Sequence, residues 1–316
     1  MIPIYSYDNG IFAIDAQYER PLRAAIHFVI DRGRAAIIDT AHNPSVKHTL
    51  QAAAQLGLKR EDVDYICLTH VHLDHAGGAG ALMREFSEAK LVVHPRGARH
   101  MANPVQLMAG VKAVYGATEA ERLYGELLPV PEERIIAAAD EMSIKLGNRE
   151  LRCLDTPGHA RHHHCYYDTT ANAVFTGDVF GVSYRELDVD DRQSVIVTSS
   201  PVQFDPQAMR DSIRRILALQ PKTLYLTHFS QLREPEARGD DLYRLIDAYV
   251  AIAERAGSDE EGRCQRIADG LWQLFDAEAQ RQGWTLPHEK MRELLKSDTE
   301  LNAQGLDVWL KSCAKA

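Results

Sequence analysis

The ten residues from Thr69 to Gly78, with the sequence THVHLDHAGG, constrain this chain more than any other segment. They place three histidines and one aspartate, which are common metal ligands, within six positions. The preceding run, residues 64–68, is short, apolar and partly aromatic, which predicts a buried strand. Residues 79–86 predict a helix. We therefore expect the four side chains on a loop between a strand and a helix, where a rigid scaffold can aim them.

The spacing of these side chains predicts two metal ions. In an extended segment, residues two apart point the same way, so His70 and His72 can bind one ion. Asp74 and His75 lie past the bend and are expected to face a second ion. The alternative, that these are ordinary surface or core residues gathered by chance, is disfavoured by their density.

Three further predicted strands also end in metal-ligand residues. A strand at 150–154 leads into a tight Pro-Gly turn that delivers His159, and strands at 173–176 and 223–226 precede Asp178 and His228. A packed sheet brings its strand ends to one rim, so we expect these side chains to meet the histidine loop. Near them, His163 is expected to support a ligand. Asp39 ends another strand and could bind metal, although holding the histidine loop by hydrogen bonds is favoured.

These motifs, in this order, resemble the metallo-β-lactamase-fold hydrolases, and in particular their glyoxalase II and lactonase-like branch. The resemblance covers residues 1–235 and implies an α+β fold, a four-layer αβ/βα sandwich with a dinuclear metal site at one edge. It implies the following ligands: His70, His72 and His159 for the first ion, Asp74, His75 and His228 for the second, and Asp178 bridging both.

The implied activity is hydrolysis by a metal-bridging hydroxide, with Asp74 as the catalytic residue that orients it. A small ester-like substrate is expected, with thioesters and lactones ahead of phosphodiesters and β-lactams. Zinc is the first choice for both divalent ions; iron and manganese stay open because imidazole and carboxylate ligands suit all three. Two alternatives also stay open: a metal-containing ligand-binding or regulatory protein with little turnover, and a di-iron redox enzyme.

Two segments beside the expected site have open roles. In the insert 179–205, Tyr184 could donate a hydrogen bond to the substrate, as tyrosines do in lactonase-like relatives; filling loop space is the favoured alternative. Residues 95–131 predict short helices broken by glycine and proline, either a lid or pocket wall, or a helical pair that covers the sheet.

Composition limits the partners. The formal charge is −9 with no basic stripe, which disfavours a nucleic-acid substrate and leaves a small molecule. Five scattered cysteines without a C-x-x-C pair fit a reduced compartment, and we see neither a secretion signal nor a membrane-spanning run, so a cytoplasmic protein is expected. A charged break at 234–240 predicts a catalytic domain over 1–235 and a helical extension over 236–316, which could pack on it, wall the substrate cleft or form a homodimer.

Overall fold

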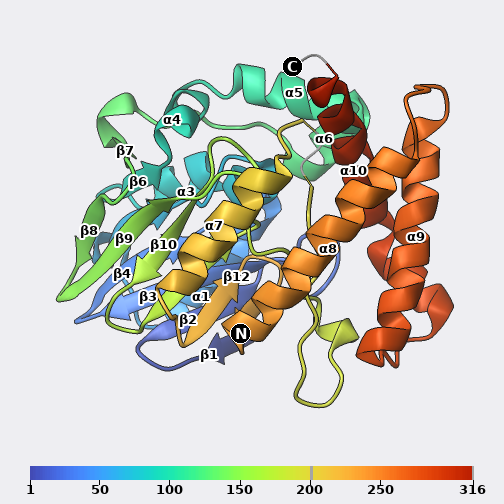
Figure 1. Ribbon diagram of the computed structural model, residues 1–316. Coiled ribbons are helices and arrows are strands. Elements are labelled where there is room, and N and C mark those ends of the chain that lie inside the picture. The colour runs from blue at the N-terminus through green and yellow to red at the C-terminus, as the bar shows by residue number, and fades with distance from the viewer. Residues whose placement is uncertain (200–201, 315–316) are drawn as a thin grey trace. The chain divides into compact units, whose positions relative to one another are not determined.

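The computed structural model describes residues 1–199 and 202–314 (Figure 1). The chain forms two compact units. The first comprises Met1–Asp155, His162–Gly177 and Pro221–Gln231, and the second comprises Thr156–Arg161, Asp178–Gln220 and the chain from Leu232 onward. The predicted domain boundary at residue 235 stays a prediction.

The first sheet of the first unit has seven strands in chain order. Strands β1 to β4 form an antiparallel meander, and β4 to β7 are parallel. The parallel half contains β5, the predicted buried strand before the histidine loop. The strands are β1 (Ile4–Ser6), β2 (Ile11–Asp15), β3 (Ala25–Asp31), β4 (Arg34–Ile38), β5 (Val63–Cys67), β6 (Lys90–Val93) and β7 (Ile135–Ala137).

The second sheet has six strands in the order β13-β12-β11-β10-β9-β8. The strand predicted at 150–154 is β9, which forms a hairpin with β8, and the turn contains Gly147 at φ +59°, a conformation that glycine adopts readily. β10 was not predicted from the sequence. The strands are β8 (Ser143–Leu146), β9 (Arg149–Asp155), β10 (His164–Asp168), β11 (Ala173–Gly177), β12 (Thr223–Leu226) and β13 (Ser230–Leu232).

One apolar layer lies between the two sheets, which face each other (Figure 1). Ile38 and Val92 from the first sheet pack with Leu151, Tyr166 and Phe175 from the second, and all five are almost completely buried. Burying each such side chain contributes about 1.5–3 kcal/mol, so this layer fixes the strand ends that carry the site. Three of the five cysteines are also buried, as expected for core residues.

The other face of the first sheet is covered by helices, whose apolar residues join a second core. Residues 95–131 form three short helices, as predicted. The first begins at Pro95 and is capped by His94, whose Nδ1 accepts a hydrogen bond from the main-chain N–H of Arg96 (3.1 Å). The helical segments are η1 (Asn43–Ser45), α1 (Val46–Gln55), η2 (Arg60–Asp62), α2 (Leu73–Ala76), α3 (Ala79–Glu85), α4 (Pro95–Ala102), α5 (Val105–Tyr115), α6 (Ala117–Tyr124) and η3 (Glu132–Arg134).

The second unit is helical, and two expectations for it were wrong. The charged stretch at 234–240 is not a break: α8 begins at Pro235, which fits a first helical turn, and Gly239 lets α8 approach Leu217 of α7. The two helices expected at 287–296 and 301–311 are one, because residues 297–300 contain neither glycine nor proline. The segments are η4 (Arg185–Leu187), α7 (Pro206–Ala218), α8 (Pro235–Arg255), α9 (Arg263–Gln282) and α10 (His288–Cys313).

Within residues 1–199 and 202–314, no helix combines the length and the apolar composition needed to cross a membrane.

Candidate metal centre

The histidine segment lies between β5 and α3, as the sequence predicts, but it is not a loop throughout, because a short helix, α2, occupies residues 73–76. His70 and His72 lie on the loop, and Asp74 and His75 lie in the first turn of α2. The rings of His70 and His75 are fully buried, which requires that their polar nitrogens have partners.

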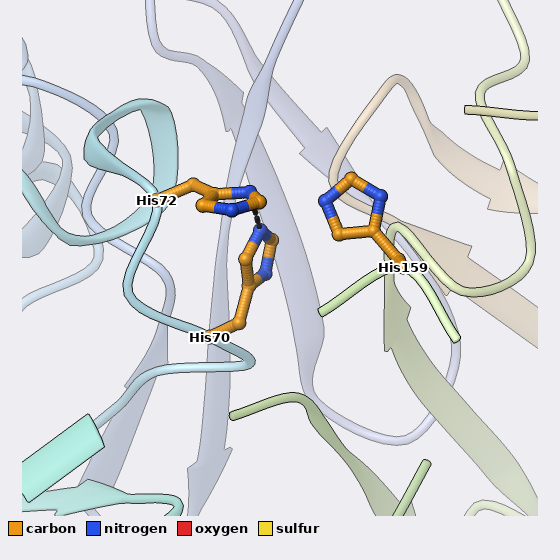
Figure 2. Close-up of side chains that lie close together, drawn as sticks. All are labelled: His70, His72 and His159. Carbon is orange, nitrogen blue, oxygen red and sulfur yellow. Dashed lines mark hydrogen bonds between the residues drawn. The ribbon is translucent and has the colours of Figure 1, made fainter. Parts of the chain in front are cut away.

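His70 and His72 point toward each other (Figure 2). Their facing nitrogens, Nε2 of His70 and Nδ1 of His72, are 2.9 Å apart. Two nitrogen ligands of one tetrahedral zinc ion, each about 2.0–2.1 Å from the metal, lie about 3.3 Å apart. The separation in the structure is close to that value, so this pair fits a shared ion with little movement.

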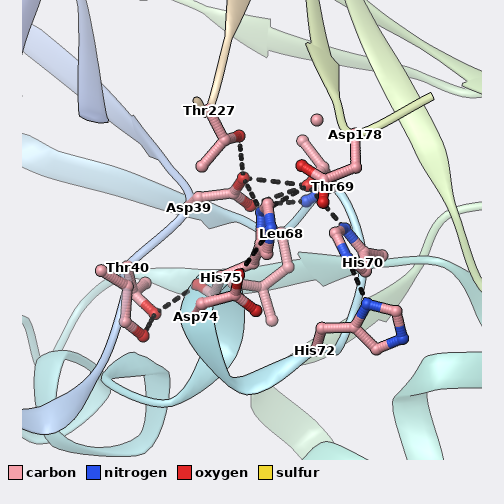
Figure 3. Close-up of polar contacts among 12 residues, drawn as sticks. Asp39, Thr40, Leu68, Thr69, His70, His72, Asp74, His75, Asp178 and Thr227 are labelled. Atoms are coloured by element: carbon pink, nitrogen blue, oxygen red, sulfur yellow. Dashed lines mark hydrogen bonds and ion pairs between the residues drawn. The ribbon is translucent and has the colours of Figure 1, made fainter. Parts of the chain in front are cut away.

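The carboxylate of Asp39 is the shared partner of several hydrogen bonds next to the histidine segment (Figure 3). Its buried carboxylate accepts hydrogen bonds from the main-chain N–H of Thr69 (2.8 Å), the hydroxyl of Thr69 (2.9 Å) and the hydroxyl of Thr227 (2.7 Å). Its Oδ2 is also 2.8 Å from Nδ1 of His75. These contacts favour the supporting role over the ligand role for Asp39, because both carboxylate oxygens already accept hydrogen bonds.

The ring of His228, at the end of β12, is held through its Nδ1 atom, as the ring of His75 is. Its Nδ1 donates a hydrogen bond to the carbonyl oxygen of Arg23 (2.7 Å). With Nδ1 as the donor in both rings, the neutral tautomer leaves a lone pair on each Nε2. The Nε2 atoms of His75 and His228 lie 3.7 and 3.5 Å from Oδ2 of Asp74.

Asp74, His75 and His228 can each offer one ligand atom, and these atoms all lie within 4.8 Å of one another. Two lone pairs and a carboxylate repel one another at such distances. A cation among them converts the repulsion into attraction, and the carboxylate and imidazole donors suit a divalent transition metal. The residues present therefore fit the metal that the sequence predicts, and the hydrogen bonds of Nδ1 are those expected around a metal site.

In the second unit, His159 and Asp178 also place a ring nitrogen opposite a carboxylate. His159 follows Gly158, whose φ of +132° and close approach to the backbone of Met209 exclude a larger residue. Nδ1 of His159 donates to the carbonyl oxygen of Thr198 (3.3 Å), and its Nε2 lies 3.5 Å from Oδ2 of Asp178. The two predicted ligands from this unit therefore lie together, with a ring nitrogen again facing a carboxylate.

His163 is buried next to the loop, with its ring centroid 5.1 Å from that of His70. The space around it is tight, because a Cβ atom on Gly177 would lie only 2.6 Å from Nε2 of His163. The hydroxyl of Tyr184 donates to Asp298 of α10 (2.9 Å), and the tyrosine is buried. These contacts favour the space-filling alternative for Tyr184; its part in substrate binding stays a prediction.

Sequence reasoning missed a buried pair of tyrosines, Tyr18 and Tyr124. The hydroxyl groups of Tyr18 and Tyr124 are 2.6 Å apart, and the ring of Tyr18 packs edge-on against His42. Burial raises the pKa of both tyrosines, and the charge of Asp74 is the next largest cause. Tyr124 ends α6, so the segment 95–131 contacts Tyr18 through this residue. No spacing in the sequence signals this contact, because the two tyrosines are 106 positions apart.

Comparison with known proteins gives one family. The profile of the metallo-beta-lactamase superfamily matches residues 20–228. The metallo-beta-lactamase fold-containing protein ST1585 of Sulfurisphaera tokodaii is 27% identical over 194 residues, which are 59% of this chain and 67% of that protein. The hydroxyacylglutathione hydrolase of Maricaulis maris is 26% identical over 200 residues, 63% of this chain and 58% of that protein.

A solved structure agrees on the fold. The metallo-beta-lactamase family protein TTHA1429 from Thermus thermophilus has a TM-score of 0.65 and 18% identity, and the match covers 96% of this chain and 94% of that chain. The predicted layered α+β sandwich with C-terminal helices is therefore confirmed. Because the profile spans more than half of the chain and includes all seven predicted ligands, the chain belongs to the metallo-β-lactamase superfamily.

Proposed function

We propose that this protein is a dinuclear metal-dependent hydrolase of a small thioester or lactone. The proposal rests above all on the group formed by Asp74, His75 and His228, whose tautomers direct two lone pairs at a carboxylate. In the proposed site, the ligands are those that the family resemblance implies: His70, His72 and His159 for one ion, Asp74, His75 and His228 for the other, and Asp178 for both.

Zinc is the proposed metal at both positions. Histidine nitrogen and carboxylate oxygen are its usual partners in catalytic sites, and the proposed ligands include no cysteine. Iron and manganese accept the same donors, so the metal content of the purified protein decides among the three.

Bound divalent ions of this kind lower the pKa of water and polarise a carbonyl oxygen. The chain's own contribution begins with Asp74, which we propose as the catalytic residue that orients the attacking water and accepts a proton. Its side chain is 25% exposed, whereas that of His75 is fully buried. Asp74 is therefore the member of this group that water and substrate can reach, while the histidines hold the geometry.

The relatives support a thioester. The Maricaulis maris protein is named for hydrolysis of hydroxyacylglutathione, whose acyl group is joined to sulfur. This chain covers little more than half of that protein, so the acyl and thiol parts of the substrate here are a matter for experiment.

Hydrolysis of a substrate panel tests the proposal. Thioesters, lactones, phosphodiesters and a chromogenic β-lactam are offered to metal-loaded and chelator-stripped protein, with Asp74→Asn as the inactive control. We expect chelator-sensitive turnover of thioesters first. If two ions bind and no bond type is cleaved, the protein is instead a binding or regulatory member of its family.

The ligand assignment is tested separately by metal content. His72→Ala and Asp178→Ala are expected to fold and to bind fewer than two ions per chain. Folded variants that still hold two ions would show that the assignment is wrong.

A further inference from the structure

We infer that Asn302 of the C-terminal helix α10 is a positioning residue for His159. The inference deepens the proposed function and rests on it, since His159 is one of the proposed ligands. It assigns a role to the helical extension, which the family motifs do not reach.

Asn302 holds a short loop segment of the insert 179–205. Nδ2 of Asn302 donates a hydrogen bond to the carbonyl oxygen of Val197 (3.2 Å). Oδ1 of Asn302 accepts one from the main-chain N–H of Ser199 (2.7 Å). The hydroxyl of Ser199 donates to the main-chain oxygen of Asn302 (3.0 Å). Asn302 is 2% exposed, so these hydrogen bonds form away from water, where losing a partner is costly.

The residue between these two anchored neighbours is Thr198, whose carbonyl oxygen accepts the hydrogen bond from Nδ1 of His159. With Val197 and Ser199 both held by one asparagine, the Thr198 carbonyl cannot turn without breaking a buried hydrogen bond. Asn302 therefore fixes the direction of the acceptor that selects the tautomer and orientation of the His159 ring.

A second helix, α8, also holds the carbonyl group of Val197. Tyr249 of α8 donates its hydroxyl hydrogen to the carbonyl oxygen of Val197 (3.0 Å) and accepts from Nδ2 of Asn302 (3.2 Å). The tyrosine is fully buried. The asparagine amide, the phenol and the loop carbonyl thus form a closed network, and such buried networks rigidify what they hold.

The same helix also holds the other end of the insert. Asp298, one turn before Asn302, accepts from the hydroxyl of Tyr184. Val182, two residues before Tyr184, and Ile196, directly before Val197, exchange a pair of main-chain hydrogen bonds of 2.9 Å, which ties the arms of the insert together. The insert starts directly after Asp178, so α10 holds the segment adjoining each of the proposed ligands of this unit.

Metal affinity measures the positioning role. Zinc dissociation constants are determined by competition with a chromophoric chelator, together with metal content and the thermal midpoint. We expect Asn302→Ala to weaken the binding of one of two ions roughly 10- to 100-fold, the range found when outer partners of metal-binding histidines are lost. Tyr249→Phe keeps the asparagine and is expected to give a smaller change of the same sign; it serves as the test if Asn302→Ala does not fold.

Thr299→Val is the matched control. Thr299 lies in the same helix and is buried to a similar extent, and its hydroxyl donates to the carbonyl oxygen of Leu295 within α10 (2.7 Å). This variant is expected to lower the thermal midpoint without changing zinc affinity. If Asn302→Ala and Tyr249→Phe lower the midpoint and leave both affinities unchanged, Asn302 is merely structural and the inference is wrong.

A measurement on metal-free protein separates this inference from the proposed function. Nitrogen NMR of the His159 ring reports its tautomer, and we expect the Nδ1–H form in the parent protein and a mixture in Asn302→Ala. Two tightly bound ions without hydrolysis would overturn the hydrolase and leave this result standing. An unchanged tautomer would overturn the positioning role even in an active enzyme.

Discussion

Oδ2 of Asp39 lies 2.8 Å from Nδ1 of His75, and this contact links the fold of the first unit to its candidate metal site. Asp39 directly follows β4, while Thr69 follows β5 and Thr227 follows β12. Three strand ends, from two sheets, therefore meet on one buried carboxylate. The position of the His75 ring depends on all of them.

Replacing Asp39 by alanine should weaken the binding of zinc to the candidate site. The change removes the acceptor for His75 Nδ1 and frees the ring to adopt the other tautomer. We expect a roughly 10- to 100-fold loss of zinc affinity, measured by chelator competition. Thr227→Val, which removes only one of the donors to Asp39, should cause a much smaller loss. Equal losses in both variants would contradict the central position of Asp39.

Gly177→Ala should damage the site through a steric clash. The new Cβ atom would lie 2.6 Å from Nε2 of His163 and 2.7 Å from the hydroxyl oxygen of Thr69, at a φ of +51°. We expect a loss of stability of about 1–3 kcal/mol, together with weaker metal binding. Gly257→Ala is the control, because Gly257 also has a positive φ of +80° but no atoms within 4 Å of the added Cβ. The difference in unfolding free energy between the two variants isolates the clash from the backbone strain.

Acid should destabilise the protein partly through His27. Burial lowers the pKa of His27 from 6.5 to about 4, with the charge of Asp39 acting in the opposite direction. Between these values the unfolded chain binds a proton that the folded chain does not, so stability is full above pH 6.5 and falls as the pH drops toward 4. The loss for this one group is about 3 kcal/mol. In metal-free protein, His27→Gln should show a shallower fall in urea unfolding free energy over this range; parallel curves would contradict the assignment.

Removal of metal should lower the thermal midpoint in a concentration-dependent way. A ligand that binds only the folded state stabilises it by about 4 kcal/mol when its free concentration is 1,000 times its dissociation constant. Chelator-treated protein should therefore unfold at a lower temperature, and titration with zinc should restore the midpoint progressively. A midpoint that does not respond to zinc would show that the folded chain does not bind it.

Local patterns predicted the parts of the site that depend on neighbouring residues. The segment from His70 to His75 and the turn before His159 are each short, and the proposed ligands in them follow strands with clear apolar patterns. The helix α7 has a similar local origin, because Pro206 fits its first turn and its buried apolar residues recur at helical spacing.

The sequence could not indicate what depends on distant contacts. β10 begins at His164, a polar residue within a run of three histidines, so the sequence gives no apolar pattern at the start of this strand. In the structure the ring of His164 is buried, with Nε2 2.7 Å from the carbonyl oxygen of Leu68. The contacts of Tyr18 with Tyr124 and of Asn302 with Val197 likewise join segments about a hundred residues apart. Such pairs carry no spacing that a single chain reveals.

The meeting of three strand ends on Asp39 also indicates where this protein can be redesigned. Libraries that vary Asp39 together with Thr69 and Thr227 would weaken metal binding in most members, since these changes converge on the same carboxylate. Diversity is better placed in α5, which buries none of its eleven residues. Changes on α5 leave the hydrogen bonds of Asp39 in place, because Thr69, His75 and Thr227 lie outside this helix.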